Sequence, residues 1–356
     1  MAEEPDVSLV VSGQRHEGWK SVSIHMGIEE LAPTFQVSLT ERWTQAREPM
    51  PIVEGDRVEL SIGETLVLTG YVDDVDEDYD AQSHSVSVSG RTRTGDLVEC
   101  AAIHKGGSIR GRNIKQIAEL LCAPFGITVS LSEPGLDIGE AIKAFTIQDG
   151  ESVFDSLNEL ARKEGILLLV DAKGNLVLAR AASEPLGTVS VDKFNIKRGS
   201  RRKSMRERFS NYLIKSQLAG SDLLSGTGAA HVKATAYDDA VLRYRPLTIV
   251  DHGGTVALAN QRATWERNTR AGRALVLAYD VRGWTHHYGV WTPNTLVRVD
   301  DERFNIDDHM LVTSVDLSRT LEQGRVATLE LMARETFDVL KPPKPPKRKR
   351  GLAALL

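Results

Sequence analysis

The feature of this sequence that most limits its fold is the alternation of apolar and polar residues in its first hundred positions. Short alternating runs recur between clusters of glycine, proline and acidic residues. They are Val7–Val11, Ser21–Ile24, Phe35–Leu39, Arg57–Ile62, Leu66–Leu68, Gly70–Val72 and His84–Ser89. Because successive side chains of a strand point to opposite faces, this period predicts half-buried antiparallel strands. Residues 1–98 are therefore predicted to form a small antiparallel β-barrel or sandwich, and closing the sheet into a barrel would remove its exposed edges.

The pattern becomes helical after residue 99. Asn113 and Gln116 have the spacing of a capping box, and Pro124 ends the segment. The apolar positions between them follow helical spacing: Ile114, Ile117, Ala118, Leu121 and Cys122. A second helix is predicted from Asp149 to near Gly165, followed by a hairpin over residues 166–178. Residues 99–180 are therefore predicted to be an α+β domain.

Alternation returns beyond residue 181. The predicted strands are Gly187–Val191, Phe209–Ile214, Val232–Thr235, Ala274–Tyr279, Leu296–Val299, Leu311–Val315 and Val326–Leu331. We predict a second β-barrel domain over residues 181–340, with a helical insertion at about 237–275, and a loop over the glycine- and serine-rich residues 221–230. Residues 341–356 are predicted to be a basic, proline-rich disordered tail, because proline lacks an amide donor and fixes φ. The overall expectation is a mainly β fold with an α+β insert.

The two β segments resemble each other. Residues 51–58, 70–75 and 86–97 have an approximate counterpart in residues 293–299, 310–315 and 328–339. The spacings differ by a few residues, so chance alternation in two β segments is an alternative explanation. A true repeat would mean that the chain contains two related barrels.

Composition restricts the classes of function. The chain has 356 residues, 41% of them hydrophobic and 26% charged, which is typical of a folded globular protein. It contains no run of about 18 apolar residues, and its acidic start is unlike a secretory signal, so we expect no membrane association. Its two cysteines, Cys100 and Cys122, suit a reducing compartment. The net charge of −5 includes six positive residues after residue 340, so the chain body, residues 1–340, carries −11. Such an acidic surface is a poor general binder of nucleic acid, because contacts with phosphate need positive charge.

No group of residues has the spacing of an active site. His286, His287 and His309 lie near four aspartates in sequence but match no strict metal-ligand pattern, so solvent-facing acidic turns are the simpler interpretation. There is no GxSxG motif and no P-loop lysine. We therefore predict no catalytic residue, no metal, no cofactor and no enzymatic activity.

Two local features are candidates for contact with other proteins, and a third is an acidic run. A basic segment could bind a phosphate backbone or an acidic partner subunit, and we favour the protein partner; its residues are Lys197, Arg198, Arg201, Arg202, Lys203, Arg206 and Arg208. Trp284 and Trp291 are expected to pack in a core or at an interface. An acidic run with Asp73, Asp74, Asp76 and Asp78 lacks the calcium-loop pattern, and we expect it to be a solvated loop of like charge.

The order and spacing of several segments resemble the baseplate hub family of contractile tails, which includes the tail protein of Mu-like phages, the hub of T4-like phages and the N-terminal part of type VI secretion spikes. No single motif is a chemical signature. The segments are Thr146–Leu157 with the Gly165–Arg180 hairpin, Arg243–Leu247, Ala263–Glu266 with Arg270, and Val290–Val299.

The resemblance implies a structural role. A family member of this kind would be a homotrimer whose two barrels per chain give six similar surfaces, which adapt a hexameric tail tube to a three-fold spike. The implied partners are the tail spike protein, the tail tube protein and other baseplate proteins, with DNA passing through without specific binding. In such a hub the acidic loop with Asp73, Asp74, Asp76 and Asp78 could face the lumen through which DNA passes. The implied location is the virion tail baseplate, after assembly in the host bacterial cytoplasm. Alternatives from other classes are a tail-associated peptidoglycan hydrolase and an OB-like nucleic-acid-binding module.

Overall fold

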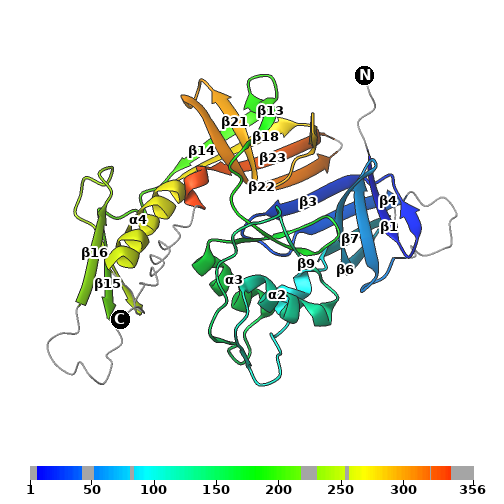
Figure 1. Cartoon of the computed structure of the whole chain (residues 1–356). Helices are drawn as coiled ribbons and strands as arrows, with labels where there is room; N and C mark the ends of the chain where they lie inside the picture. The colour runs from blue at the N-terminus through cyan, green and yellow to red at the C-terminus, as the bar shows by residue number, and fades with distance from the viewer. Residues whose placement is uncertain are drawn as a thin grey trace. The chain divides into compact units, whose positions relative to one another are not determined.

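The computed structural model describes residues 6–41, 52–80, 84–217, 231–252, 256–320 and 322–337, and it divides them into two compact units. The first unit runs to Lys203 and resumes at Gly272, and the second comprises residues 204–271. The fold is mainly β with a small α+β insert, as predicted (Figure 1). The predicted loop at 221–230 and the predicted tail at 341–356 lie outside the described residues.

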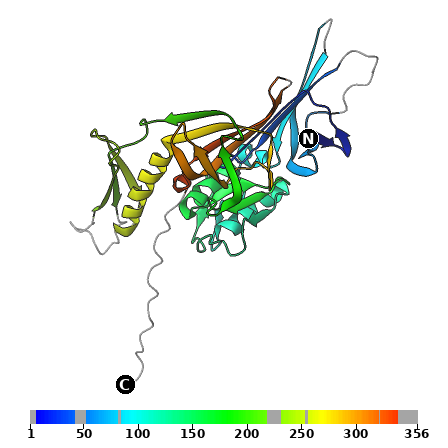
Figure 2. The ribbon, with the colours of Figure 1, turned by 90° about the horizontal axis from the view of Figure 1, so that it is seen from above.

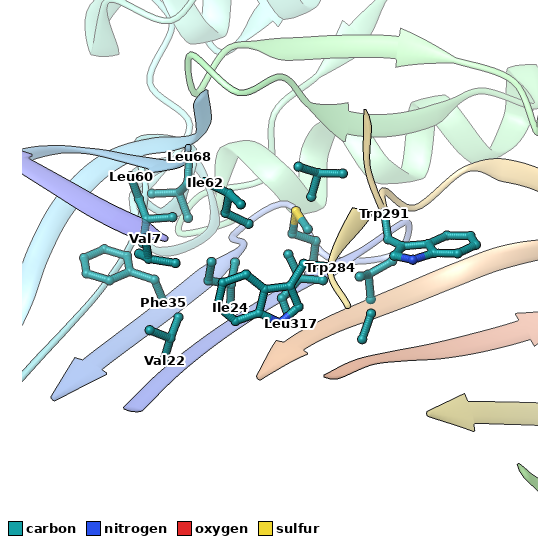
Figure 3. Close-up of a cluster of buried hydrophobic side chains, with 14 of the residues drawn as sticks. Val7, Val22, Ile24, Phe35, Leu60, Ile62, Leu68, Trp284, Trp291 and Leu317 are labelled. Atoms are coloured by element: carbon teal, nitrogen blue, oxygen red, sulfur yellow. The ribbon is translucent and has the colours of Figure 1, made fainter. Parts of the chain in front are cut away.

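The first β module confirms the strands that alternation predicted. Its elements are β1 (Val7–Val11), β2 (Gln14–His16), β3 (Ser21–Gly27), β4 (Thr34–Glu41), β5 (Arg57–Ile62), β6 (Thr65–Tyr79) and β7 (His84–Thr92). Their hydrogen-bonded order is β3-β4-β7-β6-β5-β1-β2, and every neighbouring pair is antiparallel. The apolar side chains of one face form the core, in which Val7, Leu60 and Leu68 are fully buried (Figure 3).

The second β module repeats this arrangement. Its elements are β13 (Pro185–Asp192), β14 (Ile196–Lys203), β18 (Leu275–Arg282), β21 (Thr295–Asp301), β22 (Ile306–Thr320) and β23 (Gly324–Met332). Their order is β14-β18-β23-β22-β21-β13, with antiparallel pairs from β14 to β21 and a parallel β13–β21 pair. Strands β14, β18, β21, β22 and β23 therefore match β3, β4, β5, β6 and β7 in order and direction. The internal repeat that the sequence indicated is present in the topology.

The two modules share one sheet. Strand β22 pairs with β21 and β23 in its own module, and its residues 314–319 also pair with β3 of the first module. Among the described residues, the pairing does not close either module into a ring of its own; it joins them in a 13-stranded sheet. Most buried residues of both modules belong to one apolar cluster, whereas Leu296 and Leu311 belong to a separate, smaller one.

The α+β insert occupies the chain between the modules. Its elements are α1 (Gly95–Glu99), β8 (Ser108–Ile109), α2 (Ile114–Cys122), the 3-10 helix η1 (Ala123–Phe125), β9 (Val129–Leu131), β10 (Phe145–Thr146), α3 (Val153–Glu164), β11 (Leu167–Val170) and β12 (Leu176–Ala179). The predicted capping box is present. The Asn113 side-chain oxygen accepts from the Gln116 backbone amide, and the Gln116 side-chain oxygen accepts from the Asn113 backbone amide. Helix α3 begins at Val153, not near Asp149, because the Ser152 side chain caps the Asp155 amide.

The second unit has its own sheet and its own core. Its strands are β15 (Asn211–Gln217), β16 (His231–Tyr237) and β17 (Pro246–His252), in the order β16-β15-β17. Helix α4 (Val256–Arg273) follows, and its Ala259 and Ala263 belong to a core cluster with Tyr212 and Ile214 (Figures 1 and 2). The insertion spans residues 204–271, so it begins well before the predicted helical insertion at about 237–275, and it includes three strands as well as the helix.

The remaining elements are a two-stranded sheet of β19 (Thr285–His286) and β20 (Gly289–Val290) and a 3-10 helix, η2 (Arg334–Thr336). None of the helices that the structure describes is both long and apolar enough to span a bilayer.

The acidic run was predicted to be a loop, and this was wrong. Strand β6 continues through Asp73 to Tyr79 and pairs with β7 as far as His84. Aspartate and glutamate disfavour strands intrinsically, but pairing with the alternating serines and valines of β7 overrides that preference.

Candidate functional site

Strand β14 is a basic sheet edge. It pairs with β18 on one side, and the described residues contain no strand on its other side. All of its residues except Ile196 are exposed. Five residues of the predicted basic segment lie on it: Lys197, Arg198, Arg201, Arg202 and Lys203. Arg201 lies over the Phe304 ring and donates to the Phe304 carbonyl at 2.7 Å.

The end of β6 is an acidic sheet edge. Residues 74–79 pair with β7 on one side, whereas the β5 pairing on the other side stops at Tyr71. Asp74, Asp76, Glu77 and Asp78 are exposed along this edge. Among the described residues, no strand covers it. Asp73 differs from these residues, because it is the extra residue of a β-bulge and forms an ion pair with Arg91 at 2.7 Å.

The junction between the modules shows how this chain joins two such edges. There β3 and residues 314–319 of β22 pair antiparallel, with His25 opposite Asp316 and Ile24 opposite Leu317. His25 Nδ1 contacts Asp316 Oδ1 at 2.5 Å, and His25 Nε2 contacts Glu30 Oε2 at 2.8 Å. The hydrogen bond to Asp316 raises the pKa of His25 to about 9, against an opposing effect of burial.

The opposite face of this junction is apolar. Ile24 and Leu317 are fully buried, and Figure 3 shows them in the same apolar layer as Trp284. The joint therefore has an ion pair on one face and core packing on the other.

The structure separates the predicted basic segment. Arg206 and Arg208 belong to the second unit, not to the strand that carries the other five residues. Arg208 forms a two-point ion pair with the buried Asp238, at 2.8 and 2.7 Å. This geometry occupies the Arg208 guanidinium inside its own unit.

Trp284 and Trp291 are core residues. Each is 2% exposed, and Trp284 Nε1 donates to the carbonyls of Ser318 and Val326. Of the two roles expected for them, packing in a core or at an interface, the structure shows core packing.

The histidine–aspartate group does not form a metal-ligand set. Arg298 pairs with Asp307 at 2.9 Å, and this pairing lowers the pKa of the Asp307 carboxyl. Among the described residues, no three His, Cys, Asp or Glu side chains come close enough together to hold a metal ion. Cys122 is buried, which raises the pKa of its thiol to about 12, and Cys100 is exposed.

Comparison with known proteins gives this architecture a family. The profile described as "Mu phage baseplate assembly protein GpP-like, N-terminal" matches residues 6–92, "Baseplate hub protein gp44-like, second domain" matches 94–180, and "Mu phage baseplate assembly protein GpP, fourth domain" matches 255–340. Baseplate hub protein gp44 of Escherichia phage Mu is 32% identical over 338 residues, which cover 93% of this chain and 88% of the relative. The chain belongs to the Mu-type baseplate hub family.

Solved structures agree with this membership. The 43 kDa tail protein of prophage MuSo2 from Shewanella oneidensis is 32% identical, with a TM-score of 0.84 over 94% of this hub-family chain and 100% of the other. The tail protein from Neisseria meningitidis MC58 has the same fold, with a TM-score of 0.79 over 95% and 99% of the two chains at 23% identity. The resemblance drawn from the sequence is thereby confirmed. The first two profiles end at residues 92 and 180, near the predicted boundaries at 98 and 180.

Sequence reasoning found the charges of this hub-family chain but missed that they lie on strand edges. The sequence of β14 has no apolar alternation, because all of its residues except Ile196 are exposed. The signal that could have revealed it was the repeat itself, since β14 occupies the position of β3.

Proposed function

We propose that this chain is the homotrimeric hub of a contractile phage-type tail, located in the virion baseplate, where it adapts a hexameric tail tube to a three-fold spike. The observation that supports this proposal is the repeated topology of the two β modules. Three copies of a chain with two similar modules present six similar surfaces, the number that a six-fold neighbour requires.

The proposal includes the partners. The tail tube protein, the spike protein and other baseplate proteins contact the hub, and DNA passes through it without specific binding. The acidic balance of the chain body supports passage without adhesion, because a negative surface repels the phosphate backbone.

The deciding experiment is single-particle imaging of the purified chain mixed with the tube and spike proteins of the same tail. We expect particles with a three-fold axis, in which three hub chains contact one six-fold ring. Particles with another symmetry, or a hub that joins neither neighbour, would overturn the proposal.

The proposal assigns no catalytic role to the chain. A zymogram on peptidoglycan should show no clearing with the full-length protein. A clearing band would favour the alternative of a tail-associated hydrolase.

A further inference from the structure

We propose that the acidic edge of β6 and the basic edge of β14 bind each other between copies of this chain. In this interface, residues 74–79 of one copy pair antiparallel with β14 of the next copy, so the sheet continues from chain to chain. The inference rests on the proposed homotrimer and names its interface.

Strands β6 and β22 occupy equivalent positions in the two modules. Both are long strands, and both contain a β-bulge against the following strand, between Val72 and Asp74 in β6 and between Val312 and Ser314 in β22. A bulge marks one position in a strand, so it fixes the alignment of the two. Residues 74–79 of β6 therefore correspond to residues 314–319 of β22, which pair with β3 inside the chain.

Strands β14 and β3 are also equivalent, residue by residue. Val75 follows the bulge of β6 and pairs with Val88, and Val315 follows the bulge of β22 and pairs with Leu329, so Val88 and Leu329 are equivalent. On their other sides, Val88 pairs with Val37 and Leu329 pairs with Tyr279. Val37 then pairs with Val22, and Tyr279 pairs with Gly199. Arg201 and Arg202 consequently correspond to Ile24 and His25.

The register of the proposed interface follows from the two alignments. Asp316 lies opposite His25 inside the chain, so Asp76 of one copy lies opposite Arg202 of the next. The neighbouring pair is Glu77 with Arg201, which points to the other face of the sheet because side chains alternate. The ion pair of the internal junction thus recurs at the equivalent position of the junction between copies, again with opposite charges.

The distribution of charge favours this pairing over other pairings of the same edges. Charged side chains on an edge strand also serve to keep sheets from associating, and either sign would serve that purpose. Here the two edges carry opposite signs. Pairing β14 with β14, or β6 with β6, places like charges opposite each other, whereas β14 with β6 places opposite charges together.

The pairing is of the kind that generates a ring. Each copy offers a different edge at its two ends, so the contact is head-to-tail and repeats until it closes. The junction of β22 with β3 inside each chain alternates around the ring with the junction of β6 and β14 from neighbouring chains. Three copies then contribute six modules through six joints of similar construction.

Disulfide trapping tests the register. Two cysteines replace the facing residues, Asp76→Cys with Arg202→Cys, in a full-length chain that also carries Cys100→Ser. The control moves one cysteine by two positions, Asp76→Cys with Ser200→Cys. Residues directly opposite each other lie within disulfide distance, whereas diagonal ones lie about 7–8 Å apart. Under mild oxidation we expect disulfide-linked dimers and trimers from the first variant, at about ten times the yield of the control.

Charge reversal tests the electrostatics. Arg202 and Asp76 are exposed, and Arg202→Glu or Asp76→Arg alone should weaken self-association about tenfold at low salt, because each places like charges face to face. The double variant should recover it. Matched controls with the same change in net charge are Arg243→Glu and Asp239→Arg, both at exposed positions of the second unit. Self-association is measured by sedimentation equilibrium at several salt concentrations.

The outcomes separate this inference from the proposed function. Equal cross-linking by both cysteine pairs, or no recovery in the double variant, overturns the strand pairing. If a three-fold particle with tube and spike still forms despite that result, the hub role is retained and its chains contact each other through a different interface. In-register cross-links in a particle without three-fold symmetry would keep the strand pairing and overturn the trimeric hub.

Discussion

At the scale of single residues, paired polar groups show how the β modules accommodate charge. His25 and Asp316 form an ion pair where two modules meet, and the Tyr279 hydroxyl donates to Asp301 Oδ2 at 2.9 Å inside the second module. Asp301 also accepts from the amides of Arg303 and Phe304. A carboxylate removed from water is stable only with such donors, so each bond fixes the local arrangement of its strand.

The His25–Asp316 pair predicts a pH dependence of stability. The folded-state pKa of His25, about 9, lies above its ordinary value of 6.5. The pair therefore stabilises the fold fully below about pH 6.5, and the contribution disappears as the pH rises through about 9. Because the side chain is partly exposed, we expect a loss on the order of 1 kcal/mol. Urea unfolding at pH 6 and pH 10 should show this loss in the native chain and not in His25→Gln. An NMR titration of His25 with a midpoint near 6.5 would contradict the prediction.

The Tyr279–Asp301 bond predicts a specific loss of stability. Tyr279→Phe keeps the ring in the core but removes the donor from a buried carboxylate, which should lower the free energy of unfolding by about 1–3 kcal/mol. Chemical denaturation measures the difference. Tyr288→Phe, at an exposed position, is the matched control and should change little. An equal effect of the two substitutions would show that the bond does not matter.

At the scale of elements, the close contact of β6 with β7 depends on glycine. A Cβ atom on Gly70 would lie 1.8 Å from the Arg91 carbonyl oxygen, and one on Gly90 would lie 2.0 Å from the Tyr71 carbonyl oxygen. Both approaches are to backbone atoms, which cannot move aside as a flexible side chain can. These glycines therefore permit the close approach of the two strands next to the bulge, after which β6 continues as the acidic edge.

Substitution at this contact should disrupt the first module. Gly70→Ala should destabilise the chain by about 3 kcal/mol or more, because the clash forces the two strands apart. The control is Gly95→Ala in α1, where the nearest atom to an added Cβ is 3.5 Å away. Thermal unfolding followed by circular dichroism should show a large shift for the first variant and little for the second. A Gly70→Ala chain as stable as the native one would mean that β6 and β7 can separate at no cost.

At the scale of the whole molecule, the second unit is an insertion into a repeated module. It interrupts the chain between β14 and β18, which correspond to β3 and β4, and those two strands are joined directly by residues 28–33. Lys203 and Leu275 are paired across β14 and β18, so the ends of the insertion lie close together. Closely spaced ends let an inserted unit fold without disturbing its host.

Removal of the insertion tests this arrangement. Deleting residues 204–271 leaves Gly272, Arg273 and Ala274 as a three-residue connection between β14 and β18, a length that hairpins accept. We expect the shortened chain to fold, with cooperative unfolding and a mainly β circular dichroism spectrum. A chain that is expressed only as aggregate would show that the first unit depends on the second.

Local sequence patterns were sufficient to predict the mainly β class, most strands of both modules and the capping box of α2, because period-two alternation and capping are properties of consecutive residues. The order and spacing of longer segments indicated the family. The sequence also indicated the repeat. It did not reveal β14 as a strand, β6 as continuous through its carboxylates, or the β22–β3 joint, since each depends on a partner strand far away in the chain. Trp284 and Trp291 could be assigned to a core only once the surrounding strands were placed. Only the tertiary structure showed that the two charged segments are sheet edges among the described residues, because an edge is defined by the absence of a neighbouring strand, which no local pattern encodes.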